Sequence, residues 1–278
     1  MVTPEREILE LKLRVELEPT SVSALVALGE VYQRSGLDAE ADQAFRRVLE
    51  FDPQNPHARR GRVYLLRRCY AEAADAYGRA AIVHQVGDLR DPEAAAWLGS
   101  LVDSAEPVVC QKVAEALGKS GDRSAVPILI RLLRSEAACA WWQASEALAA
   151  IGDRAAVPPL VATLAKGQAN ARSAAAHALG LLRDPAALEG LLAALAAEDA
   201  SVRRAAAKAL GQLGDASAVP ALAHALEDPD PETRAPALEA LQALTGLTFR
   251  ATIFGSARRA ARRWWDKTGQ RRPWGAGA

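Results

Sequence analysis

The sequence contains few aromatic residues, and this limits the folds that it can form. Only 5% of its 278 residues are aromatic, although half are hydrophobic. The apolar residues are therefore mainly Ala and Leu, which are strong helix formers. Strands favour β-branched and aromatic residues instead, so the composition argues against a fold built mainly from sheets.

Charge, cysteine and long apolar runs are limited too. Lys plus Arg and Asp plus Glu both total 34, and this balance argues against nucleic-acid binding over the whole surface. The three cysteines, Cys69, Cys110 and Cys139, form no Cys-x-x-Cys pair, so we expect no disulfide framework and a reducing, cytoplasmic location. The sequence contains no run of eighteen apolar residues, so we predict no membrane span. The start of the chain lacks the apolar block of a signal peptide.

Sequence motifs for catalysis are also missing. His57, His84, His177 and His224 stand in no His-Glu-x-x-His arrangement, and the cysteines lack metal-ligand spacing. The sequence has no GxxxxGK[ST] phosphate loop, GxSxG elbow or GxGxxG turn. We therefore predict that the chain is not an enzyme, and that it has no catalytic, metal-binding or cofactor-binding residues.

Most of the chain is instead an internal repeat with a period of 31 residues. Five units follow one another without an insertion from Asp91 to Thr245. The period is visible in columns of identical residues, two of which are Asp91, Asp122, Asp153, Asp184 and Asp215, and Leu117, Leu148, Leu179, Leu210 and Leu241. A fixed step of this length is typical of proteins built from stacked helical units.

Each unit is predicted to form two helices. In the fourth unit, apolar residues recur at three- and four-residue steps over residues 185–197 and again over 201–213. Asp184 followed by Pro185 is typical of a helix start. Gly121, Gly152 and Gly214 end units, where a left-handed residue can close a helix.

The fourth unit, DPAALEGLLAALAAEDASVRRAAAKALGQLG, resembles the short bacterial HEAT-like repeat that also occurs in phycobilisome lyases. Val202-Arg203 and Ala209-Leu210-Gly211 match the hallmark columns of that repeat, and Arg172 and Arg234 recur at the position of Arg203. The first two units depart there, with Cys110 and Trp141. Deoxyhypusine hydroxylase, an enzyme family with HEAT-like repeats, holds di-iron through His-Glu pairs that this sequence lacks.

A different repeat precedes this array. The positions that resemble the tetratricopeptide (TPR) pattern are Leu28, Gly29, Tyr32, Ala41, Phe45 and Pro53. A weaker copy follows 32 residues later, with Gly61, Tyr64, Ala73 and Tyr77. Residues 4–18 are predicted to form a lone helix that ends before Pro19.

Together the two resemblances imply an all-α fold, a right-handed αα-superhelical solenoid. We predict TPR-like repeats over residues 1–87, five HEAT-like repeats over 88–245 and a basic, tryptophan-containing cap and tail over 246–278. One helix pair cannot cover its own apolar face, so neighbouring units must stack.

The resemblance to HEAT-like repeats implies that the second helix of each unit lines a concave surface. On that basis the partner-binding residues are predicted to be Gln111, Glu115, Trp142, Glu146, His177, Arg204, Lys208 and Glu239. Trp141 and Trp142 point about 100° apart on one helix. An exposed tryptophan on this surface would be a good hot-spot candidate, and the alternative is that both indoles are buried between repeats.

The C-terminal segment carries a basic patch of Arg258, Arg259, Arg262 and Arg263. These arginines lie beside or opposite an apolar helical stripe that ends in Trp264 and Trp265. The segment is predicted to cap the last repeat, with its tryptophans against that repeat and its arginines in water. Alternatively, or in addition, the arginines form a docking site for anions.

These features favour a bacterial scaffold or adaptor that binds a protein or peptide along its concave surface. One alternative is binding of nucleic acid or an anionic surface through the basic C-terminal segment. The other is an enzyme on a HEAT-like scaffold, similar to a bilin lyase. The sequence does not identify the partner.

Overall fold

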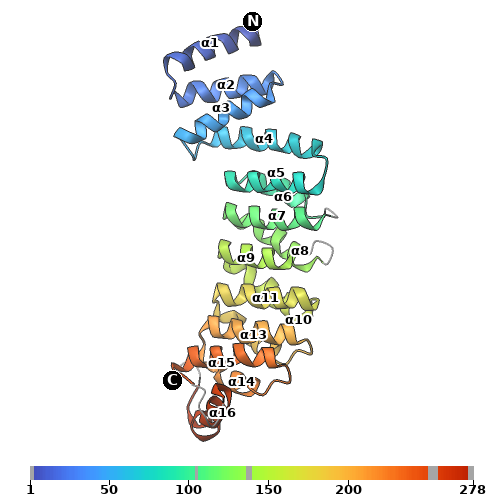
Figure 1. Cartoon of the computed structure of the whole chain (residues 1–278), viewed down its shortest axis with the longest axis vertical. Helices are drawn as coiled ribbons and strands as arrows, with labels where there is room; N and C mark the ends of the chain where they lie inside the picture. Colours follow the sequence, from blue (N-terminus) through green and yellow to red (C-terminus); the bar gives the residue numbers. More distant parts are fainter. Residues whose placement is uncertain (1–2, 104–105, 136–139, 250–255, 275–278) are drawn as a thin grey trace. The chain divides into compact units, whose positions relative to one another are not determined.

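All regular elements are helices in the part of the chain that the structure describes, residues 3–103, 106–135, 140–249 and 256–274 of a computed structural model. The predicted all-α fold is therefore confirmed. The helices divide into two compact units, residues 1–122 and residues 123–278. In each unit the helices are stacked in successive layers, as in a solenoid (Figure 1). Cys139 lies outside the described residues.

The first unit is a stack of helices in which each main helix contacts its neighbours. Its described elements are α1 (Pro4–Leu17), α2 (Val22–Arg34), α3 (Asp38–Phe51), α4 (Pro56–Glu72), α5 (Ala76–Leu89), α6 (Ala94–Ser100) and α7 (Pro107–Ser120). The fully buried ring of Phe45 lies against the Cα atoms of Gly29 and Gly61, and an added Cβ at either glycine would collide with it. Two small residues thus let α2 and α4 close over one aromatic ring of α3.

In the second unit, short and long helices alternate. Its described elements are η1 (Arg123–Ala125), α8 (Val126–Arg134), α9 (Trp141–Ile151), η2 (Arg154–Ala156), α10 (Val157–Lys166), α11 (Ala169–Leu182), η3 (Pro185–Ala187), α12 (Leu188–Ala194), α13 (Ala200–Leu213), η4 (Ala216–Ala218), α14 (Val219–Ala225), α15 (Pro231–Thr245), α16 (Ala257–Lys267) and η5 (Gly269–Arg271). Helices α9, α11, α13 and α15 are the second helices of consecutive repeats, and each contacts the next (Figure 1).

The ends of the repeats follow the local chemistry of the sequence. Asp153, Asp184 and Asp215 each accept a hydrogen bond from the backbone amide two residues later. A 3-10 turn follows each of these aspartates. The proline at the sixth place of a repeat then lies in the first turn of the α-helix, where its missing amide costs no helical hydrogen bond. The closing glycines of three units have φ of 68°, 68° and 85°, as predicted. Arg90 and Arg183 take the same left-handed position, with φ of 50° and 51°.

Small residues allow the second helices to stack closely. A Cβ added at Gly180 would lie 2.7 Å from Cα of Ala209, and one at Gly211 would lie 2.9 Å from Cα of Ala240. Gly87 meets Ala116 in the same way, at 2.7 Å. Helix α5 therefore stacks on α7 as α11 stacks on α13, although residues 56–87 resemble a second TPR copy in sequence.

The packing of that second copy also differs from the packing of the first. Tyr64 and Tyr77 correspond to Tyr32 and Phe45 by the 32-residue spacing, but they are 48% and 75% exposed. Tyr32 and Phe45 are buried. The aromatic residues of the second copy therefore do not fill a space between paired helices as those of the first copy do.

In the repeats that carry it, the recurring arginine ties the second helix to backbone carbonyls of the preceding segment, as Arg203 shows. Arg203 donates from Nε and Nη2 to both carboxylate oxygens of Asp228, at 2.7 and 2.9 Å, and from Nη1 to the carbonyls of Ala197 and Glu198. The hydrogen bond from Arg203 is the main reason that the pKa of Asp228 lies below its ordinary value. Arg79 makes the same kind of contact, because it donates to the carbonyl six residues back, that of Ala73, as Arg203 does to Ala197. Arg79 precedes Arg203 by 124 residues, which is four periods.

One of the two repeats without this arginine has a different contact at the same position. The Cys110 thiol donates to the Val102 carbonyl at 3.6 Å, eight residues back. Arg172 likewise reaches eight residues back, from Nε to the Leu164 carbonyl at 2.8 Å. A cysteine can thus replace one of the arginine's hydrogen bonds, but not the ion pair with the following loop.

Helix α16 closes the C-terminal end of the second unit. Ser256 begins the helix and accepts a hydrogen bond from the Arg259 amide. Trp265 is buried and makes an edge contact with the ring of His224 on α14. The prediction that all four arginines face water is wrong for two of them, because Arg258 and Arg262 are half-buried and donate to the carbonyls of Leu226 and Ala223. These carbonyls lie at the end of α14, where they have no partner within the helix.

Candidate functional site

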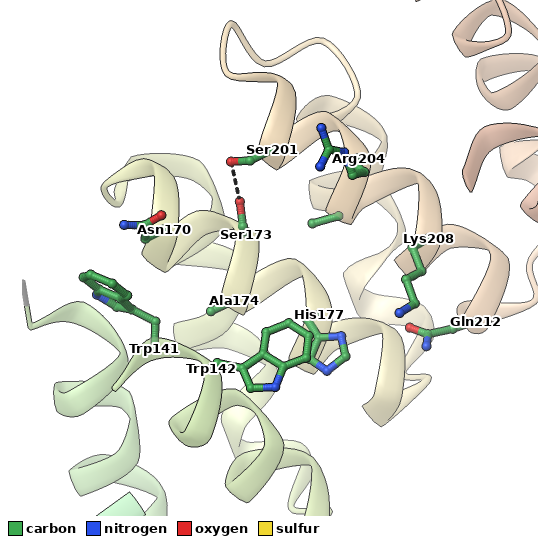
Figure 2. A pocket seen from close by; sticks show the side chains of 11 residues that line it. Trp141, Trp142, Asn170, Ser173, Ala174, His177, Ser201, Arg204, Lys208 and Gln212 are labelled. Carbon is green, nitrogen blue, oxygen red and sulfur yellow. Dashed lines mark hydrogen bonds between the residues drawn. The ribbon is translucent and has the colours of Figure 1, made fainter. Parts of the chain in front are cut away.

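Helices α9, α11 and α13 form a shallow, open pocket of about 390 Å³. Successive second helices are one period apart, so residues at 31-residue intervals lie next to one another, as Trp142, Ser173 and Arg204 do. We call this hollow the Trp142 pocket. Its lining residues, seen in Figure 2, are Trp141, Trp142, Asn170, Ser173, Ala174, His177, Ser201, Arg204, Ala205, Lys208 and Gln212.

The exposed aromatic residue of this pocket is Trp142. Its side chain is 55% exposed, and its indole stacks on the imidazole of His177 with ring centroids 4.1 Å apart and planes at 20° (Figure 2). On the sequence alone His177 was predicted to face solvent, and this is wrong because His177 is only 8% exposed. Trp142 covers one face of the imidazole, and Glu146 approaches Nε2 to 2.6 Å. The contacts of His177 therefore hold the indole in a fixed orientation.

Trp141 has a different environment on the same helix. It is half-buried, and its Nε1 is buried without a hydrogen-bond partner among the described residues. Of the two indoles, that of Trp142 is therefore the exposed one. Nε of Arg204 and Oε1 of Gln212, in the same pocket, are also buried and have no hydrogen-bond partner within the part of the chain that the structure describes.

The two cations of α13 differ in their partners. Arg204 contacts Glu232 at 2.5 Å and Asp230 at 3.4 Å through Nη2. A hydrogen bond from the Thr233 hydroxyl lowers the pKa of Asp230 below its ordinary value, so Asp230 is ionised at neutral pH and attracts Arg204. Lys208 is exposed and makes no ion pair with any residue that the structure describes. The positive charge of Lys208 is thus available to a partner.

The structure brings together only part of the predicted set. Trp142, His177, Arg204 and Lys208 line the pocket, and Glu146 contacts His177. The others lie elsewhere: Gln111 and Glu115 are half-buried on α7 of the first unit, and Glu239 is exposed on α15.

Several lining residues were not predicted from the sequence. They are Trp141, Asn170, Ser173, Ala174, Ser201, Ala205 and Gln212. The 31-residue step already pointed to some of them, because Ser173 lies midway between Trp142 and Arg204 and because Ala174 and Ala205 are one period apart. Small and uncharged side chains were overlooked there, although they create the hollow.

A second hollow, of about 270 Å³, lies at the basic patch. It is lined by Glu227, Arg258, Arg259, Arg262 and Arg263. Of these four arginines, Arg259 and Arg263 are exposed, whereas Arg258 and Arg262 are half-buried and Arg262 also pairs with Asp266 at 3.2 Å. Two rather than four of the guanidinium groups are therefore exposed to an anionic partner in the described part of this segment.

The described residues contain neither a membrane-spanning helix nor a cluster of metal ligands. Among these helices, none combines the length and the apolar character that a bilayer crossing requires. In the same residues, no cluster of three or more His, Cys, Asp and Glu side chains is arranged to hold a metal ion.

Paired helices that recur every 31 residues and stack through small side chains define an α-helical repeat protein. A family model of HEAT repeats matches residues 65–139, 141–200 and 188–249, which is more than half of the chain. The chain belongs to the HEAT-repeat family. The first match begins within α4 and includes α5, in agreement with the stacking of Gly87 on Ala116.

Solved structures with a similar fold include both enzymes and designed proteins. Human deoxyhypusine hydroxylase in complex with glycerol is 21% identical over 75% of this chain and 91% of its own, with a TM-score of 0.36. An engineered protein is 23% identical over 68% of this chain and 93% of its own, with a TM-score of 0.45. A chain in the complex of CpcE and CpcF of phycocyanin lyase from Nostoc sp. PCC7120 is 22% identical over 96% of this chain and 94% of its own, with a TM-score of 0.38. No curated protein matches the sequence.

Proposed function

We propose that this chain is a scaffold that binds a segment of a partner protein at the Trp142 pocket and performs no chemistry of its own. The main support is the exposed indole of Trp142, held in place by His177 and Glu146. A tryptophan at the surface keeps a large apolar area in water, and burying that area against a partner releases free energy. Tryptophan and arginine are also the residue types that dominate binding hot spots.

The rigidity of the indole favours binding further. An unsupported surface side chain loses rotamer freedom when it is fixed in a complex, and this costs about 0.5–1.5 kcal/mol for a flexible residue. Because Trp142 already stacks on a buried imidazole, less of that cost remains to be met on binding. The neighbouring repeats extend the same surface, as helical-repeat proteins do when they bind extended segments.

We also propose a finer assignment of the repeats: short units of the phycobilisome-lyase type over most of the array, and a TPR over residues 20–55. The burial of Leu28, Tyr32, Ala41 and Phe45 supports the second assignment. Both assignments describe the stacking of helices and are independent of the ligand.

A quantitative pull-down from the source organism tests the proposed scaffold role. The bait proteins are the wild-type chain, a Trp142→Ala variant and a Tyr77→Ala variant. Tyr77 is a matched control, because it is an aromatic residue with 75% exposure that lies outside the pocket. We expect the wild type and Tyr77→Ala to retain the same partner, and Trp142→Ala to lose it.

Circular dichroism on each bait shows whether the variant is folded. Equal recovery of every captured protein by all three baits would refute binding at Trp142. A partner retained by Trp142→Ala but lost on removal of residues 256–274 would instead support the alternative that the basic C-terminal segment binds an anionic surface.

A further inference from the structure

We infer that the occupant of the Trp142 pocket is a peptide segment that inserts an aromatic side chain and places an Asp or Glu, a few residues away, next to Lys208. This inference rests on the proposed function, since it names the chemistry of the partner at the same site.

The shape and lining of the pocket favour a planar apolar side chain. Ala174 and Ala205 are one period apart, and both line the hollow beside the larger Trp142. One face of the indole already lies on His177, so its exposed part is available for an offset or edge contact with a second ring. Such contacts between aromatic rings add about 0.5–1.5 kcal/mol to the effect of burial.

The charges around the pocket favour an acidic residue next to the aromatic one. Arg204 is already ion-paired with Glu232 and Asp230 through Nη2, and Glu146 contacts His177. Lys208 has no ionic partner among the described residues, although it lines the same hollow. A carboxylate on the partner would supply the negative charge that Lys208 can pair with. Complementary charges at the edge of an interface mainly set specificity and the association rate.

The open form of the site favours a protein segment over a free small molecule. All lining residues come from α9, α11 and α13, and no other element of the described residues lines this open pocket. Small-molecule sites usually bury most of their ligand, about 70–90% of its surface. A peptide that belongs to a larger partner can itself cover the outer side. At the rim, exposed Asn170 offers an amide that can bind the peptide backbone.

The test is a selection of binders from a random peptide display library, with the full-length chain as target. The wild type, Trp142→Ala, Trp142→Phe, Lys208→Glu and Lys166→Glu are compared. Lys166→Glu is the control for charge, because Lys166 is an exposed lysine of the same unit outside the Trp142 pocket. We expect wild type, Trp142→Phe and Lys166→Glu to select peptides that combine an aromatic residue with a nearby Asp or Glu.

The two substitutions at the pocket should change the selection in different ways. Trp142→Ala should select no common motif. Lys208→Glu should select peptides that keep the aromatic residue but carry Lys or Arg in place of the acid. Its affinity for a peptide selected by the wild type, measured by fluorescence anisotropy, should be lower by roughly fivefold or more.

The outcomes separate this inference from the proposed function. Peptides that need Trp142 but carry no acid, or that bind Lys208→Glu as well as wild type, would overturn the inference and leave the scaffold role intact. If Trp142→Ala selects the same peptides as the wild type, both the inference and the proposed function are overturned.

Discussion

The ion pair between Arg203 and Asp228 offers the sharpest test of how the repeats are held together. Both side chains are largely buried, with 12% and 7% of their area exposed, and two hydrogen bonds join them. Arg203→Ala removes the cation and leaves the carboxylate of Asp228 buried without its partner. Breaking a buried pair in this way typically costs about 3–5 kcal/mol. We expect a loss of this size in the free energy of unfolding of the second unit.

Urea unfolding followed by tryptophan fluorescence measures this loss. Five of the six tryptophans lie in residues 123–278, so the signal reports mainly on the second unit. Arg204→Ala is a matched control, because it removes the same charge one residue further along. Its side chain is 41% exposed and its partner Glu232 is 70% exposed, so solvent screens the interaction and the effect should be much smaller.

The effect of Arg203→Ala should also depend on pH. The hydrogen bond from Arg203 lowers the pKa of Asp228 in the folded protein. The stabilisation is therefore fully present above the pKa of an unfolded aspartate, about 3.9, and is lost as the pH falls through the lowered value. The difference between wild type and Arg203→Ala should be largest near pH 7 and should shrink in acid. Equal losses for Arg203→Ala and Arg204→Ala, or a difference that grows in acid, would refute the reasoning.

Three further predictions test the stacking and the helix ends, each by urea unfolding. Leu210→Ala should cost about 2–5 kcal/mol, because Leu210 is fully buried, whereas Lys208→Ala on the same helix should cost little; equal losses would mean that the faces of α13 are misassigned. Arg183→Gly should stabilise the protein by about 1 kcal/mol, because φ of 51° strains a side chain, and Gly214→Ala at the equivalent position should destabilise it; opposite signs would contradict this. Gly211→Ala should cost about 1–3 kcal/mol despite the better helix propensity of alanine, since its Cβ would meet Ala240, and a stabilised variant would disprove the close approach.

The period of the repeat also clarifies which part of the site was predictable. Trp142, His177, Arg204 and Lys208 were predicted because residues of the second helices recur on one face every 31 positions. The error at His177 arose because periodicity gives the direction of a side chain but not what covers it. The indole that covers His177 belongs to the preceding repeat, and no pattern within one helix reveals such a contact.

The sequence by itself determined the helices, their 31-residue period, their aspartate and proline starts and their left-handed ends. These features depend on interactions within a few residues along the chain, and the local residue types specify them. Only the tertiary structure decided that Trp142 is exposed, that His177 is buried beneath it and that α5 stacks in the manner of a HEAT helix. It also decided that Lys208 has no ionic partner among the residues that the structure describes. These depend on side chains about thirty residues apart in sequence, and their burial is set by the volume and charge of neighbours that come together only when the repeats stack.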